Sequence, residues 1–299
     1  MQKDYLQRFI FQQADVRGEL VHLEKSWQEI IANTQYPDVV QNYLAQMMAA
    51  TVLLAATIKI DGSITIQASG DGLLNLMITE CRHDLSIRAI AKYDQKGMAG
   101  LEHTLAPGEL PKLNELLVNS SFIITIQQSN GQRYQGIVEV KGNNIAEILE
   151  NHLATSEQIK TKIKLSHTEN TCAGILLQEL PNHHDNDDTW NELSLLTDTL
   201  TDDELNQLDT STIVNRLFNE HSVRIFEAQE ISFRCTCSYE KVSKMLMSLG
   251  YQEAQSIIEQ SDFIEVACEF CNKNYKFDEI AIAEIFSPQN HTENKRSYH

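Results

Sequence analysis

The chain has 299 residues, of which 42% are hydrophobic and 22% are charged, enough apolar material for a sizeable core divided among two or more units. This composition excludes a disordered or fibrous protein as a description of the whole chain. The formal net charge of −18 repels phosphate backbones and anionic lipids, so neither a nucleic acid nor a membrane surface is the expected partner.

The amino-terminal residues 1–17 mix charged and apolar side chains without an uninterrupted apolar core, so we expect no secretory signal. The most apolar stretch, residues 44–58, is followed by Lys59 and Asp61 and is shorter than a membrane span requires. The sequence therefore predicts a cytoplasmic protein without a membrane segment.

Residues 1–180 mix helix and strand patterns. Pro37 precedes Asp38, a suitable N-cap, and residues 39–58 are apolar almost all round, which predicts a long buried helix. Turn residues at 70–72 and 129–131 predict two hairpins. Strands are expected at 63–67, 73–80, 86–93, 122–127, 133–140, 162–165 and 174–179, and a second helix at 145–154. The fold class is therefore predicted to be α+β, with an antiparallel sheet in this core domain.

Residues 181–230 carry 12 acidic side chains and two arginines, so more than half of the excess negative charge lies here. The segment opens with a polar run at 181–188, as expected for a loop that leaves a finished domain. Thr201 and Glu204 have the spacing of a capping box, and Ser211 precedes an apolar helix face. Short acidic helices of this kind depend on docking for their stability, so we predict a metastable helical linker.

Residues 231–287 predict a small separate domain, followed by a flexible tail at 288–299. The expected order is a strand, a helix at 238–249 that Gly250 terminates, a helix at 253–260, a strand at 263–266, then a strand and a helix. A core of this size is marginal without additional cross-links.

Four of the six cysteines form two closely spaced pairs. Cys235 and Cys237 form C-x-C, and Cys268 and Cys271 form C-x-x-C. Four thiolates suit one tetrahedral Zn²⁺ per chain, so these four residues are the predicted metal ligands. Cys81 and Cys172 stand alone and are expected to be small buried hydrophobes without a part in the mechanism.

A purely structural zinc clamp is the simplest interpretation of such a site. The close spacing within each pair also allows the thiols to join as local disulfides once the metal no longer separates them. Zinc keeps sulfur in the reactive thiolate form, so an oxidant that attacks one ligand weakens the whole site. The same residues can therefore act as a clamp and as a switch.

Two alternatives use other chemistry. A zinc-ribbon nucleic-acid binder would contact phosphates through basic residues of residues 231–299, but this region has a net charge of −3. Its candidate contacts are Arg234, Lys241, Lys244, Lys273 and Lys276. A thiol-disulfide oxidoreductase would use Cys268 and Cys271 catalytically, but the strand and helix order of a thioredoxin does not surround them. No nucleophile elbow or metalloprotease motif occurs, so we expect no enzyme.

Several segments resemble the bacterial 33-kilodalton heat-shock chaperones, which are redox-regulated holdases. In the tail the resemblance lies in residues 233–238, in Leu249 and Gly250, and in residues 268–271 with Tyr275, Phe277 and Asp278. In the core it lies in residues 16–20, 36–37, 70–72 with 75–76, 133–136, 156–158 and 176–178 with Pro181. The resemblance covers nearly the whole chain except the residues from Ser287 onward.

The resemblance implies an ATP-independent, commonly dimeric chaperone that is inactive when reduced and zinc-bound. It implies that oxidation joins Cys235 to Cys237 and Cys268 to Cys271, expels zinc and destabilises the linker. Apolar surface uncovered in this way would bind unfolding client proteins.

Overall fold

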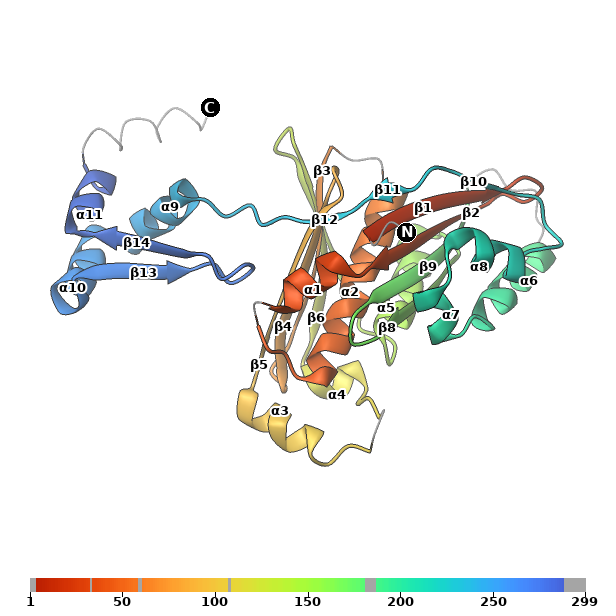
Figure 1. Cartoon of the computed structure of the whole chain (residues 1–299), viewed down its shortest axis with the longest axis horizontal. Coiled ribbons are helices and arrows are strands. Elements are labelled where there is room, and N and C mark those ends of the chain that lie inside the picture. Colours follow the sequence, from red (N-terminus) through yellow and green to blue (C-terminus); the bar gives the residue numbers. More distant parts are fainter. Residues whose placement is uncertain (1–3, 33, 59–60, 107–108, 181–186, 288–299) are drawn as a thin grey trace. The chain divides into compact units, whose positions relative to one another are not determined.

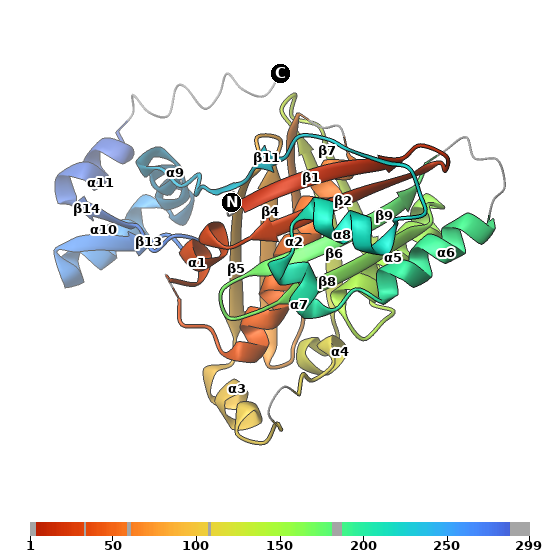
Figure 2. The same cartoon turned by 45° about the vertical axis from the view of Figure 1, so that its right-hand side comes forward.

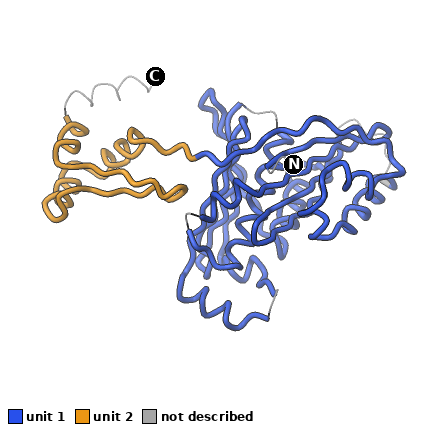
Figure 3. Tube along the Cα trace, viewed as in Figure 1, with its two compact units in different colours: residues 1–234 blue, residues 235–299 orange. Residues whose placement is uncertain are grey.

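The computed structural model describes residues 4–32, 34–58, 61–106, 109–180 and 187–287. The chain divides into two compact units, residues 1–234 and 235–299, which Figure 3 distinguishes by colour. The expected tail at 288–299 and the first six residues of the polar run that opens at 181 lie outside the described residues.

The first sheet of the first unit has the strand order β10-β1-β2-β9-β8, and β11 also pairs with β1. All of its pairings are antiparallel. Its strands are β1 (Asp4–Phe11), β2 (Val16–Leu23), β8 (Thr161–His167), β9 (Cys172–Glu179), β10 (Val223–Ile225) and β11 (Gln229–Glu230).

The second sheet has the order β12-β5-β4-β3-β6-β7. It is antiparallel except for the short β12, which pairs with β5 in parallel. Its strands are β3 (Gly62–Ser69), β4 (Leu74–Arg82), β5 (Ser86–Tyr93), β6 (Ser121–Gln128), β7 (Arg133–Val138) and β12 (Ser232–Phe233). Shorter helices border the two sheets: α1 (Lys25–Ala32), α3 (Gln95–Glu102), α4 (Leu113–Leu117), α5 (Ile145–His152) and the π-helical turn η1 (Leu153–Glu157).

Helix α2 (Asp38–Thr57) packs against both sheets and forms the centre of the main core (Figure 1). Contacts on both sides explain why its sequence is apolar all round. By length and composition α2 could cross a membrane, contrary to the expectation from residues 44–58, because the helix begins six residues earlier and gains Val39, Val40 and Tyr43. However, 78% of its most apolar window is buried inside the protein, as in the core helix of a globular fold.

Two arginines of the first sheet cap the carboxyl end of α2. Arg8 donates a hydrogen bond of 2.8 Å to the Ala56 carbonyl, and Arg17 donates one of 3.2 Å to the Thr57 carbonyl. These last carbonyls have no partner within the helix, and positive charge is favourable at this end of the helix dipole. Glu19 lies opposite Arg8 in the strand register and is 2% exposed. Burial raises the pKa of the Glu19 carboxyl to about 7, although Arg17 and Arg8 oppose the shift.

The linker helices cover the face of the first sheet that is turned away from α2 (Figure 2). They are α6 (Asp187–Asp198), α7 (Asp202–Gln207) and α8 (Thr210–Leu217). Phe218, which follows α8, is 1% exposed, and its ring centroid lies 5.1 Å from that of Phe11 and 6.3 Å from that of Phe9. Gly18 makes room for this cluster, because a Cβ atom there would lie 2.1 Å from the Phe9 ring.

A buried side chain adds a polar connection between α7 and the sheet. Asn206 is 7% exposed and donates to the Ser166 hydroxyl at 2.7 Å. It also accepts a hydrogen bond of 2.8 Å from Thr171, and its backbone carbonyl lies 2.9 Å from His22 Nε2. Removal of the Asn206 side chain would leave the buried Ser166 hydroxyl without this partner, at a cost of about 1–3 kcal/mol.

The chain then runs along the edges of both sheets as three very short strands. β10 and β11 extend the first sheet at β1, and β12 extends the second sheet at β5. The Arg234 backbone N–H donates to the Ile87 carbonyl at 3.0 Å, which is the last such bond before Cys235. We call residues 223–234 the strap.

The second unit has its own small core around a two-stranded antiparallel sheet. Its elements are α9 (Tyr239–Leu249), α10 (Tyr251–Ser261), β13 (Phe263–Ala267), β14 (Asn274–Asp278) and α11 (Glu279–Ile285). Gly250 separates α9 from α10 with φ at +97°, a value that favours glycine. The element order predicted for residues 238–287 is confirmed.

In the core, the long helix, both hairpins and the strands at 86–93, 162–165 and 174–179 are confirmed. The expectation of one antiparallel sheet was incomplete, because there are two sheets and the second includes a parallel pair. The helix predicted at 145–154 is α-helical only to His152. Thr201 forms its capping box with Glu204, but the cap of α8 is Asp209 rather than Ser211.

Glu19→Gln should stabilise the first unit at alkaline pH. The carboxyl titrates near 4.5 when unfolded and near 7 when folded, so the folded state holds an extra proton between these values. Stability from this group is therefore fully present below pH 4.5 and is lost as pH rises through 7. The variant has no carboxyl proton to lose at this position. Its free energy of unfolding, compared with that of the parent, should therefore rise by on the order of 3 kcal/mol by pH 8.

Urea unfolding followed by tryptophan fluorescence measures this difference, because Trp27 and Trp190 both lie in the first unit. Glu220→Gln, at an exposed position of the same unit, is the matched control and should show no such pH dependence. A stability difference between Glu19→Gln and the parent that stays constant from pH 5 to pH 8 would contradict the assignment.

Candidate metal centre

The C-x-C pair lies on the extended segment between β12 and α9. Immediately after Cys237, the Ser238 side chain caps α9 by accepting a hydrogen bond of 3.2 Å from the Lys241 backbone N–H. The Lys241 ammonium turns back and donates to the Thr236 carbonyl at 2.6 Å. The helix start thus holds the backbone on both sides of Cys237.

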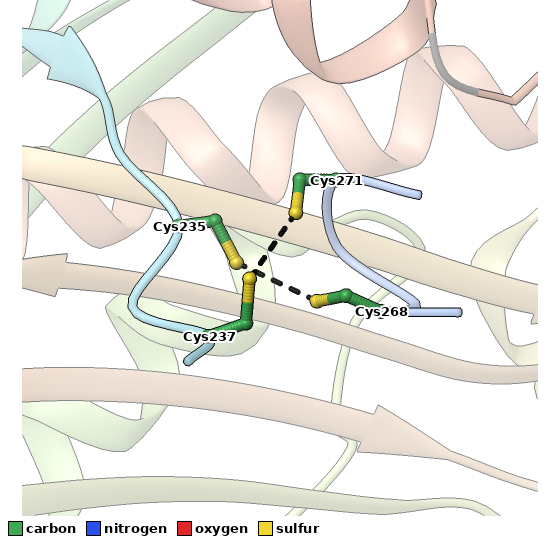
Figure 4. A group of neighbouring side chains, drawn as sticks. All are labelled: Cys235, Cys237, Cys268 and Cys271. Carbon is green, nitrogen blue, oxygen red and sulfur yellow. Dashed lines mark hydrogen bonds between the residues drawn. The ribbon is translucent and has the colours of Figure 1, made fainter. Parts of the chain in front are cut away.

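The C-x-x-C pair lies in the turn that joins β13 to β14. The Cys268 N–H donates to the Lys273 carbonyl at 3.0 Å, and the Asn272 N–H donates to the Cys268 carbonyl at 2.7 Å. Asn272 has a φ of +53°, in the left-handed region that asparagine tolerates better than most residues. This tight turn presents Cys268 and Cys271 on the same side of the hairpin (Figure 4).

The four sulfur atoms point toward one another (Figure 4), and each lies within 4.8 Å of the other three. Cys235 Sγ is 3.6 Å from Cys268 Sγ, and Cys237 Sγ is 3.5 Å from Cys271 Sγ. A tetrahedral zinc ion with bonds of about 2.3 Å places its sulfur ligands about 3.8 Å apart. All four thiols are free, and their spacing fits a metal ion and is consistent with zinc.

The pKa values of the thiols differ within this group. Burial opposes ionisation of Cys237, but hydrogen bonds from Tyr275 Oη, at 3.1 Å, and from the neighbouring thiols outweigh it and lower its pKa to about 7. Burial and the contact with Cys237 raise the pKa of Cys271 to about 12. Cys237 therefore ionises more readily than Cys271, and a bound cation would favour the thiolate form of both.

The two isolated cysteines lie elsewhere, in the core of the first unit. Cys81 is 1% exposed and Cys172 is fully buried. Burial raises the pKa of both thiols, that of Cys81 to about 12. They stay protonated and unreactive, in agreement with their exclusion from the predicted site.

Three of the five basic residues of the nucleic-acid alternative make contacts within the protein. Arg234 lies 3.4 Å from Asp84, Lys276 lies 3.9 Å from Glu265, and Lys241 binds the Thr236 carbonyl. The oxidoreductase alternative also lacks its usual setting, because the C-x-x-C pair lies in a hairpin turn rather than at a helix amino terminus. Both observations weaken these alternatives.

Sequence reasoning did not assign a role to two features. Tyr275 is one of the residues that carry the family resemblance, but the sequence assigns it no role. Its bond to Cys237 depends on the hairpin register. The apolar face beneath the linker, which includes Phe9, Phe11 and Leu20, was missed because no strands were predicted before residue 63. The apolar run in Asp4–Phe11 was the available signal.

Comparison with known proteins agrees with this architecture. The family model described as Hsp33 protein matches residues 4–278. The 33 kDa chaperonin of Pseudomonas fluorescens is 40% identical over 290 residues, which cover 95% of this chain and 94% of that protein. The 33 kDa chaperonin of Nitrosococcus oceani is 38% identical over 289 residues, which cover 96% of each.

Among solved structures, the crystal structure of a 33 kDa chaperonin from Thermotoga maritima shares the fold. Its TM-score is 0.78 at 16% identity, and the match covers 97% of this chain and 99% of that one. The fold, the family match and the two relatives all agree with the resemblance found in the sequence. The chain therefore belongs to the Hsp33 family of 33 kDa chaperonins, which are chaperones and not enzymes.

Proposed function

We propose that this chain is a redox-regulated, ATP-independent holdase that is inactive when reduced and zinc-bound. The observation that carries the proposal is the group of four cysteine sulfurs within 4.8 Å of one another, of which Cys235 directly follows the strap. The ligands of the single Zn²⁺ per chain are Cys235, Cys237, Cys268 and Cys271, and the metal keeps their sulfurs together as thiolates.

Oxidation removes the ligands from the metal. As each disulfide forms, two thiolates transfer two electrons to hydrogen peroxide. The O–O bond of the peroxide breaks, and its two oxygens take up two protons to form two water molecules. The pairs are Cys235 with Cys237 and Cys268 with Cys271, as the resemblance implies. A disulfide sulfur is a poor zinc ligand, so the metal leaves and the small second unit loses much of its stability.

The strap connects this change to the linker. Its strands are only two or three residues long, so each contributes few backbone hydrogen bonds and is easily displaced. The strap continues directly into Cys235, and a change in the C-x-C segment therefore acts on its carboxyl end. Once the strap frays, the acidic helices lose one of their attachments and a docking equilibrium of a few kcal/mol can reverse.

Undocking of the linker exposes a surface for client proteins. Eight apolar residues of the first sheet face the linker helices: Tyr5, Phe9, Phe11, Val16, Leu20, Ala173, Ile175 and Leu177. A contiguous apolar face of this kind binds the apolar segments that unfolding proteins expose. The net charge of −10 on residues 181–230 would keep the opened chaperone and its clients dispersed.

The proposal retains the functional division made from the sequence. Residues 1–180 form the client-binding and dimerisation core, 181–230 the metastable linker and 231–287 the zinc-binding redox switch. The protein acts as a homodimer during stress and binds neither nucleic acid nor membranes. A cytoplasmic location supports this role, because thiols there stay reduced until an oxidant appears.

The direct test is light scattering from a thermally unfolding client protein without ATP. Peroxide-treated protein should suppress aggregation, and reduced zinc-loaded protein at the same concentration should not, because only the former exposes the sheet face. Equal suppression by both forms would remove the redox switch from the account. No suppression by either form would leave an inert zinc clamp.

Reduced protein should contain one Zn²⁺ per chain, and Cys268→Ser should lower zinc affinity by several orders of magnitude, because one of four thiolate ligands is lost. Metal analysis and chelator competition measure both. Cys81→Ser, at a cysteine outside the group, is the control for the number of thiols. Parental zinc affinity in Cys268→Ser would exclude this residue as a ligand.

Phe218→Ala should make the reduced protein active as a holdase. The substitution removes a ring packed against Phe9 and Phe11, at a cost of about 3–5 kcal/mol, and should shift the linker toward its undocked state. The client-aggregation assay on reduced, zinc-loaded protein measures the effect. Asn206→Ala should act in the same direction without altering the apolar face.

The matched control is Asn215→Ala, on the exposed side of α8, which should leave reduced protein inactive. Hydrogen exchange of α6 to α8 establishes whether the linker has undocked in each variant. A reduced Phe218→Ala protein that stays inactive although its linker is unprotected would refute the proposed order of events.

A further inference from the structure

Tyr275 connects the two halves of the cysteine group. It lies on β14, opposite Val266 in the hairpin register, and is 6% exposed within the core of the second unit. Its hydroxyl donates a hydrogen bond of 3.1 Å to Cys237 Sγ. The bond therefore joins the hairpin that carries the C-x-x-C pair to the separate segment that carries the C-x-C pair.

The Tyr275 hydroxyl is the donor to Cys237 Sγ from outside the four cysteines. The contacts of Cys235 with Cys268 and of Cys237 with Cys271, in contrast, join the cysteines themselves. The donor to Cys237 is a side-chain hydroxyl, so replacing Tyr275 alone can remove it.

A hydrogen bond to a thiolate has two chemical effects. It holds the sulfur in one direction, which favours a ligand geometry set before the metal arrives. It also draws electron density from the sulfur, which makes the thiolate a weaker nucleophile toward an oxidant. In addition, the sulfurs of Cys235 and Cys237 must approach one another to form a disulfide, whose S–S bond is about 2.05 Å long, and a bond that holds Cys237 Sγ in place opposes this movement.

We propose that Tyr275 is a positioning residue that holds Cys237 in its metal-binding orientation and slows oxidation of the site through this hydrogen bond. The inference rests on the proposed zinc function of the four cysteines. It adds a fifth residue to the switch, one that sets how tightly the metal is held and how much oxidant releases it.

The test compares Tyr275→Phe with the parent as full-length, reduced, zinc-loaded protein. Competition with a chromophoric chelator should show zinc affinity lower by about tenfold to 100-fold, the usual effect of removing a partner of a metal ligand. Zinc release under a fixed peroxide concentration should also be faster. Tyr239→Phe deletes the same atom from a ring that packs, tilted, against Phe277 in the same unit and should match the parent in both measurements.

A double-mutant cycle separates this role from a merely structural one. Cys237→His keeps a metal-binding nitrogen but removes the sulfur that accepts the Tyr275 bond. If the bond is responsible, Tyr275→Phe should lower zinc affinity in the parent and have no effect in the Cys237→His background. Near-ultraviolet circular dichroism of the zinc-loaded proteins verifies that the second unit is folded in each variant.

The contrary outcomes are distinct. An equal loss of affinity in both backgrounds would make Tyr275 a residue of the fold alone, and no loss in either would remove it from the metal site. Both results would overturn this inference while leaving the proposed function intact. A parent protein that binds no zinc would overturn the proposed function and the inference together.

Discussion

The first sheet of this protein is apolar on both faces, and the rest of the structure depends on covering them. Helix α2 covers one face permanently, as part of the main core. The other face carries the Phe9, Phe11 and Leu20 side chains and is covered by α6 to α8. Because these helices are short and acidic, we propose that their docking is the weaker of the two packings. Control of the linker would then be control of exposed apolar surface.

The metal centre suits such control because its parts come from two separate segments. The C-x-C pair follows the strap, and the C-x-x-C pair lies in the β13–β14 turn. A metal ion that joined them would supply a cross-link to a unit with a small core. Thiolates are also the ligands most open to oxidation, so we propose that the bonds that stabilise the unit are those that an oxidant removes.

Much of this architecture could be predicted from the sequence where a pattern is local. The spacing of Cys235, Cys237, Cys268 and Cys271 predicted the cluster. The apolar sequence of α2 predicted a buried helix, and its place between two sheets explains that sequence. The β1–β2 hairpin was not predicted, because strands buried on both faces lack the alternation that identifies a half-buried strand.

Other features depend on contacts between distant segments. A polar residue such as Asn206 suggests an exposed helix face, and only Ser166 and Thr171, on and beside β8, account for its burial. The two-residue β12 is too short to give a periodic signal, and its parallel pairing with β5 brings together residues far apart in sequence. The bond between Tyr275 and Cys237 likewise requires the folded hairpin. Tertiary structure decides each of these.

Above all, we propose that oxidation of the cysteine group undocks the linker from the first sheet. Hydrogen exchange of the full-length protein, reduced and zinc-loaded or oxidised by peroxide, measures this directly. We predict that residues 187–217 lose their protection on oxidation while α2 keeps its own. An oxidised protein that suppresses client aggregation with residues 187–217 still fully protected would contradict the account.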